Sequence, residues 1–192
     1  SSVIYNFANA NAGIAKPLTV LGYTLNGISA SNYTVAQPTG ITATINKAAS
    51  SISITGSSSF TYNTTAQGPT NSNVLGSTGT VTYSYNGVSP TVYGPSSTRP
   101  TNAGTYTVTA TVAADTNYET ATSADFSFTI DKAEQTITLA STDAKTTSTT
   151  TYSLIQNASS GLPVSYTSSN PAVATVSGNT VTIIGVGTTT IT

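Results

Sequence analysis

Residues 44–48 read Thr-Ile-Asn-Lys-Ala, and residues 129–133 read Thr-Ile-Asp-Lys-Ala, 85 positions further along the chain. An apolar pair follows each copy at the same distance: Ile52 with Ile54, and Ile137 with Leu139. Self-similarity at a fixed period is the sequence signature of a repeat architecture. The two stretches therefore predict that the chain is part of an array of similar modules.

The repeat extends on both sides of these stretches. An Asn-Tyr pair ends 14 residues before the lysine in both copies, at residues 32–33 and 117–118. Asn-Ala-Gly occurs at residues 11–13 and 102–104. A third copy follows the second lysine, because residues 81–84 resemble residues 164–167, and residues 104–109 resemble residues 187–192, both at an offset of 83.

These offsets predict three modules. Residues 1–48 are the C-terminal part of one β module, residues 49–132 are a complete β-sandwich module, and residues 133–192 are a truncated third module. Both termini fall inside modules, which predicts a fragment of a longer protein. The junctions leave too few residues for a flexible linker, so we expect the modules to form an extended rod.

The composition limits the class of protein. Only 6% of the residues are charged, against about 25% in an ordinary soluble domain, and Thr, Ser, Tyr, Val and Ile favour strands. A net charge of −1 gives no attraction for nucleic acid or anionic lipid. No apolar run approaches the roughly 18 residues of a membrane span. The absence of cysteine favours a bacterial exported protein over a disulfide-linked secreted scaffold.

Alternation of apolar and polar residues predicts strands throughout. Residues 79–85 and 105–112 alternate strictly, and residues 126–130 repeat the pattern. A strand of this kind has one buried and one solvated face, as in antiparallel sheets. No stretch of ten residues shows a helical period. The predicted fold class is all-β: tandem antiparallel Ig-like β-sandwich modules. The residues expected to face the core are Val81, Tyr83, Tyr85, Tyr106, Val108, Ala110, Val112, Phe126, Phe128 and Ile130.

Glycine and proline predict the local turns. Asn86-Gly87 predicts a tight hairpin turn, and Ser177-Gly178-Asn179 a second hairpin. Pro90 confines the following strand to an edge or to a short length. Residues 17–25 read as a strand in which the apolar residues change parity beside Gly22, which predicts a β-bulge there.

Three runs of sequence carry a family resemblance. Residues 16–20, 32–35 and 44–47 resemble the YDG/MBG-type modules of very large secreted bacterial proteins, and residues 102–106, 117–118 and 129–133 are similar to the same superfamily. Residues 135–137, 160–164 and 168–174 resemble bacterial Ig-like repeats. The resemblance implies surface adhesins and their stalks, including those of gliding bacteria, located extracellularly on the bacterial cell surface. It implies no catalytic residues.

The residues offer little chemistry. Histidine, cysteine and tryptophan are absent, which removes Ser–His and Cys–His nucleophile pairs and most zinc and copper sites. We predict no catalytic, cofactor-binding or metal-binding residues, no cofactor and no enzyme activity. All six acidic residues lie between Asp115 and Asp143. Calcium requires six to eight oxygen ligands, and the first junction, around Asn46, has no acid, so calcium should not be required.

Two functions remain open. The favoured hypothesis is a structural stalk, a repeat region that projects a distal adhesive domain. The alternative is a carbohydrate-binding or ice-binding β-sandwich module, which would use rows of outward threonines or the less clearly buried Tyr5, Tyr62 and Tyr93. The expected partners are neighbouring repeats of the same chain and, through distal domains, surface glycan or other cells. Nucleic acid is not an expected partner.

Trypsin tests the tightness of the junctions. Lys16 and Arg99 precede proline, so only Lys47, Lys132 and Lys145 are cleavable, and two of these three lie at junctions. If the junctions are tight, the folded chain should resist trypsin under native conditions, measured by mass spectrometry over time. Rapid release of the 48–132 fragment would show modules joined by loose linkers.

Overall fold

The computed structural model describes residues 4–138, 150–155 and 157–192. The predicted all-β fold is confirmed: antiparallel pairing dominates, and the only helical element in the described residues is the short 3-10 helix η1 (Ala30–Asn32). The chain divides into two compact units, Ser1–Lys132 and Ala133–Thr192. The boundary predicted at residues 48–49 and the rod-like arrangement stay predictions.

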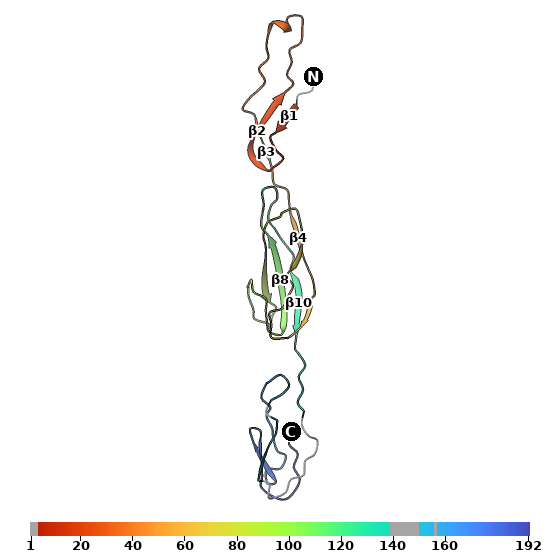
Figure 1. Cartoon of the computed structure of the whole chain (residues 1–192), viewed down its shortest axis with the longest axis vertical. Helices are drawn as coiled ribbons and strands as arrows, with labels where there is room; N and C mark the ends of the chain where they lie inside the picture. The colour runs from red at the N-terminus through yellow and green to blue at the C-terminus, as the bar shows by residue number, and fades with distance from the viewer. Residues whose placement is uncertain (1–3, 139–149, 156) are drawn as a thin grey trace. The chain divides into compact units, whose positions relative to one another are not determined.

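The first unit begins with a three-stranded antiparallel sheet, β1 (Ile4–Phe7), β2 (Gly13–Leu21) and β3 (Thr42–Ile45), with β2 in the centre (Figure 1). A bulge is present in β2, as expected, but at a different place: the register shifts between Gly13 and Lys16, where Ala15 has a φ of 51°. The predicted strand over residues 17–25 is also displaced, because β2 ends at Leu21 and Gly22 adopts a φ of 105° that only glycine tolerates easily.

Two sheets make up the rest of the first unit. The larger sheet has the order β5-β10-β8-β7, with β9 paired to β8, and the smaller one is the antiparallel pair β4-β6. The pairing of β5 with β10 is parallel, so the larger sheet is mixed rather than purely antiparallel. The strand bounds are β4 (Ser51–Thr55), β5 (Ser59–Thr61), β6 (Asn71–Leu75), β7 (Val81–Gly87), β8 (Gly104–Val112), β9 (Ala121–Thr122) and β10 (Phe126–Asp131).

Strand β8 organises this central sandwich. Its inward row is fully buried, as the alternation predicted: Tyr106, Val108, Ala110 and Val112 are at most 1% exposed. Phe128 on β10 stacks on Tyr106 with ring centroids 5.4 Å apart, and Tyr85 on β7 meets Phe128 edge-on. Ile52 of β4 packs on Ala110 and Val112 from the opposite sheet. The burial of these large apolar side chains is the main favourable term in the folding of this sandwich.

The turn predicted at Asn86-Gly87 is wrong. Both residues belong to β7 and pair with Thr107 and Tyr106 of β8. The chain reverses later, where the Thr91 N–H donates to the Val88 carbonyl, and then runs back along β7. A glycine at position 87 lets the returning backbone approach β7 closely, because a Cβ there would overlap the backbone at Thr91 and Tyr93. No positive φ is involved.

The second unit contains a three-stranded antiparallel sheet of order β11-β13-β12, formed by β11 (Thr151–Ser153), β12 (Ala174–Ser177) and β13 (Thr180–Ile183). The predicted hairpin is confirmed: Ser177 pairs with Thr180 around Gly178, whose φ is 59°. Val181 is fully buried and Ala174 is 5% exposed. Leu139, which continues the repeat in the sequence, lies outside the described residues.

Replacement of Tyr85 by phenylalanine tests the polar contact in the core of the central sandwich. The Tyr85 hydroxyl donates to the Pro69 carbonyl at 2.6 Å in a buried site, and burial raises the Tyr85 pKa. Tyr85→Phe leaves that carbonyl unsatisfied, so the free energy of unfolding should fall by about 1–2 kcal/mol. Urea unfolding followed through the NMR signals of the β8 amides measures it for this sandwich alone.

Tyr93→Phe is the matched control. The Tyr93 hydroxyl also donates to a carbonyl, that of Thr98, but at an exposed site. We expect this change to alter the free energy of unfolding by at most about 0.5 kcal/mol. Equal losses in the two variants would contradict a special role for the buried hydrogen bond.

Candidate functional site

The most specific polar arrangement outside the core joins the chain after β3 to a loop of the central sandwich. Ala48 forms an isolated parallel bridge with Tyr118. The Ala48 N–H donates to the Asn117 carbonyl, and the Glu119 N–H donates to the Ala48 carbonyl, both at 2.8 Å. These two bonds tie the residue that follows Lys47 to the loop between β8 and β9.

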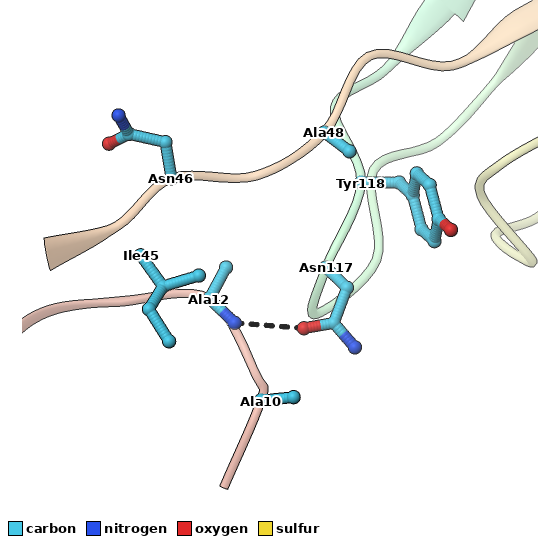
Figure 2. Close-up of a pocket in the computed structure, with 7 residues that line it drawn as sticks. All are labelled: Ala10, Ala12, Ile45, Asn46, Ala48, Asn117 and Tyr118. Atoms are coloured by element: carbon cyan, nitrogen blue, oxygen red, sulfur yellow. Dashed lines mark hydrogen bonds between the residues drawn. The ribbon is translucent and has the colours of Figure 1, made fainter. Parts of the chain in front are cut away.

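The Asn117 side chain binds a third segment. Its Oδ1 accepts from the Ala12 N–H at 2.8 Å, and its Nδ2 donates to Asn11 Oδ1 at 3.2 Å. Figure 2 shows the first of these bonds between the Asn117 loop and the chain just before β2. We call the residues that make these four hydrogen bonds the joint: Asn11, Ala12, Ala48, Asn117 and Glu119.

Asp115 fixes the shape of the joint loop. Its Oδ1 accepts from the Asn117 and Tyr118 N–H groups, each at 2.9 Å, an arrangement that mimics a backbone turn. Its Oδ2 accepts from the Thr78 N–H and hydroxyl. These hydrogen bonds, those from the Thr78 and Asn117 N–H groups first, lower the Asp115 pKa from 3.8 to about 2. The ionised carboxylate therefore stabilises the conformation that presents Asn117.

The Tyr118 ring anchors the same loop on its own sandwich. Gly76, with a φ of 100°, lies directly beneath it, and a Cβ on Gly76 would come within 2.8 Å of Tyr118 Cδ1. The Ser77 N–H donates to the Ser50 hydroxyl beside this glycine, and Ser77 Oγ donates to the Ala113 carbonyl. A glycine is required here because any side chain would displace the ring.

A pocket of about 340 Å³ opens at the joint, lined by Ala10, Ala12, Ile45, Asn46, Ala48, Asn117 and Tyr118. Figure 2 shows these alanine, asparagine, isoleucine and tyrosine side chains around it. Its lining carries no carboxylate, lysine or arginine. Its clearest chemical feature is the set of hydrogen bonds that Asn117 makes across it.

The acidic residues that could have bound calcium have different surroundings in the structure. Asp115 is occupied by four hydrogen bonds, and the exposed Asp131 accepts from Ser59 Oγ at 3.1 Å. Glu119 contributes its backbone to the joint, Glu134 is exposed, and Asp143 lies outside the described residues. In the part of the chain that the structure describes, no three acidic residues gather as a metal site would require.

The three tyrosines that could have stacked on a glycan, Tyr5, Tyr62 and Tyr93, differ in their exposure to solvent. Tyr93 packs edge-on against Tyr106, with ring centroids 5.8 Å apart, and is partly buried against the core. Tyr62 is 38% exposed and Tyr5 is 56% exposed. A side-chain hydrogen bond with Tyr23 raises the Tyr5 pKa. Two of the three therefore remain available at the surface.

Sequence reasoning missed the joint residues, although a signal for them was present. Asn117 belongs to the repeated Asn-Tyr pair, and residues 11–12 belong to the repeated Asn-Ala-Gly. Both motifs were recognised as repeats, but the contact between them spans 105 positions of sequence. A motif that recurs at a module boundary is itself an indication of an intermodule contact.

Comparison with known proteins gives two family matches. Residues 1–40 match the YDG domain, and residues 150–192 match the intimin immunoglobulin-like domain. Both are structural modules of bacterial surface proteins, and neither is a known catalytic family. No curated protein and no solved structure matches the chain. In the described residues, no helix is long and apolar enough to span a membrane. The assignment of residues 49–132 to an MBG-like module stays a prediction.

Asp115→Asn tests the electrostatic support of the joint. Because the folded pKa of about 2 lies below the ordinary value of 3.8, ionised Asp115 contributes stability that is complete above about pH 5 and is lost as the pH falls towards 2. The variant should unfold at a lower temperature near neutral pH, and the difference in Tm from the unaltered chain should shrink across this window. Thermal melting of both chains between pH 2 and 7 measures it.

Asp125→Asn is the control, because Asp125 is exposed and lies in the same sandwich. It should reproduce the melting profile of the unaltered chain. A difference between Asp115→Asn and the unaltered chain that stays constant from pH 2 to 7 would contradict the role assigned to the Asp115 carboxylate.

Proposed function

We propose that this chain is a structural repeat region of a large bacterial surface adhesin, a stalk that projects a distal adhesive domain and catalyses no reaction. The observation that carries the proposal is the joint. Two hydrogen bonds of the Asn117 side chain connect the YDG-matching residues 1–40 to the sandwich that follows, and two more hold Ala48 to the same loop. A stalk must limit bending between its modules, and a contact of this kind does so.

The joint limits bending because its contacts lie on two sides of one loop. The backbone of the loop holds Ala48, and the Asn117 side chain holds residues 11–12. Each bond contributes only about 1 kcal/mol. A hinge movement about Lys47 would leave the Ala48 bonds in place, but it would have to break both Asn117 side-chain bonds to residues 11–12. The two residues between β3 and Ala48, Asn46 and Lys47, are in addition too few for a flexible linker.

The surface of the central sandwich also suits an extracellular stalk. Its outward rows on β7 and β8 consist of Thr, Ser and Asn side chains, and Thr111 and Thr122 interact across the β8–β9 pair at 3.0 Å. Hydroxyl groups keep such a surface hydrated with few charges, so its stability should depend only weakly on salt. A stability that depends only weakly on salt suits a protein outside the cell, where the salt concentration varies.

Residual dipolar couplings test the proposal directly. In the unaltered chain, couplings from β1–β3 and from β7–β10 should fit one alignment tensor, because the joint makes the two sheets orient together. Asn117→Ala removes both side-chain bonds to residues 11–12. We expect the two sets of couplings in this variant to require separate tensors, with the order of one sheet reduced by about half.

Asn63→Ala is the matched control, because the Asn63 side chain accepts hydrogen bonds only within its own exposed turn, from Thr65. It should leave the single tensor intact. If the unaltered chain already requires two tensors, or if Asn117→Ala still fits one, the joint does not set the relative orientation and the stalk hypothesis loses its support.

A further inference from the structure

Asparagine followed by glycine occurs twice in the chain, at Asn26-Gly27 and at Asn86-Gly87. In such a dipeptide the backbone nitrogen of the glycine can attack the side-chain amide carbon of the asparagine, because no Cβ on the glycine hinders the approach. The attack closes a five-membered succinimide ring and expels ammonia. Both dipeptides share this intrinsic reactivity, so a difference between them in the folded chain comes from the structure around each.

Closure of the succinimide ring sets two structural conditions. The glycine N–H has to give up its proton to solvent, so it must not be held in a hydrogen bond. The asparagine side chain has to swing back over the main chain, so it needs free space and a backbone that can rotate. Both conditions can be read from the hydrogen bonds and the packing around each dipeptide.

The dipeptide in β7 meets neither condition. The Gly87 N–H donates to the Tyr93 carbonyl at 2.8 Å, which ties it to the returning backbone. Asn86 pairs with Thr107 of β8, and the backbone at Thr91 and Tyr93 fills the space beside Gly87. Ring closure at Asn86 therefore requires local opening of β7, and the free energy of that opening suppresses the reaction.

The dipeptide Asn26-Gly27 meets both conditions. It lies in the loop that joins β2 to β3 (Figure 1), and both residues are exposed. Within the described residues, the Gly27 N–H donates no hydrogen bond, and only the Gly27 carbonyl is engaged, by the Ala30 N–H at 3.1 Å. A Cβ built on Gly27 would meet nothing within 4 Å. The Asn26 side chain therefore has room to reach the Gly27 nitrogen.

The base of this loop is closed independently of its tip. Gln37 Nε2 donates to the Tyr23 carbonyl at 2.9 Å, and Gln37 Oε1 accepts from the Tyr23 N–H at 3.2 Å. These two bonds join the arms of the loop, and Asn26 lies between them in sequence. The backbone rotation that ring closure needs is confined to the tip, so it leaves the bonds between the arms intact.

We propose that Asn26 is a site of spontaneous deamidation, a covalent modification that needs only water. The Gly27 nitrogen forms a bond to Asn26 Cγ as the bond from Cγ to the amide nitrogen breaks, and ammonia leaves. Water then opens the succinimide at either of its carbonyls, which gives aspartate or isoaspartate. Residues 1–114 contain no acidic residue, so the product is the first carboxylate in this part of the chain and makes the net charge more negative by one unit.

Incubation of the folded, full chain at neutral pH over several weeks tests the proposal. Samples are unfolded and digested with trypsin, which places Asn26 in the peptide 1–47 and Asn86 in the peptide 48–132. Tandem mass spectrometry then locates the gain in mass that accompanies the change from amide to acid. Asn26 should deamidate at least about tenfold faster than Asn86, because only Asn86 has to wait for local opening.

The same chain unfolded in guanidinium chloride is the matched control. Without structure, the two dipeptides should react at rates within about threefold of each other. Asn26→Gln is the second control, since the longer side chain closes a less favourable six-membered ring, and it should remove the acidic form that ion-exchange chromatography separates from the starting chain. The proposal is overturned if Asn26 reacts no faster than Asn86 in the folded chain, or if Asn26→Gln leaves the acidic form unchanged.

Discussion

The inward row of β8 is the constraint on which the rest of the structure depends. Its four apolar side chains, from Tyr106 to Val112, are at most 1% exposed, and they alternate with threonines that face outward. This alternation decides which faces of β7 and β10 turn inward, because side chains opposite one another in a sheet share a face. It also creates the apolar surface that the β4-β6 pair covers. In a chain with so few charges, burial of this row is the main source of stability.

The joint is held by hydrogen bonds and packing within one loop of that sandwich. Asp115 shapes the loop between β8 and β9, Tyr118 anchors it over Gly76, and Asn117 is left free to bind residues 11–12. No ion pair or metal is needed for this arrangement, because the carboxylate acts on backbone N–H groups of its own sandwich. A chain built from such modules can limit bending between neighbours with a few repeated residues, which is what the proposed stalk requires.

Much of the fold could be predicted from the sequence, because a half-buried strand leaves a period of two in the residues. The buried positions of β7, β8 and β10 followed from that period alone. The turn at Asn86-Gly87 could not, because the same dipeptide that suits a tight turn also suits a strand approached closely by the returning backbone. The bulge was expected from a change of parity beside Gly22, but the register shift lies between Gly13 and Lys16, where the apolar residues show no change of parity that was recognised.

The joint was harder to predict for a different reason. Its residues are ordinary amides and alanines, and Asn117 meets Ala12 across 105 positions of sequence, so neither composition nor spacing pairs them. The repeat showed that both motifs recur, and only the structure showed that one binds the other. The absence of histidine and cysteine limited the chemistry from the start, and the family matches agree with a structural module.

Native-state hydrogen exchange at the Ala12, Ala48 and Glu119 amides tests most directly whether the joint is a closed structural contact. Each of these amides donates a hydrogen bond within the joint. They should exchange roughly a hundredfold more slowly than unprotected amides, and more rapidly than the β8 core amides, which open only with the whole sandwich. Exchange of all three at the rate of an unstructured chain, with the β8 amides still protected, would show that the joint is open in solution and that the modules are not held to one another.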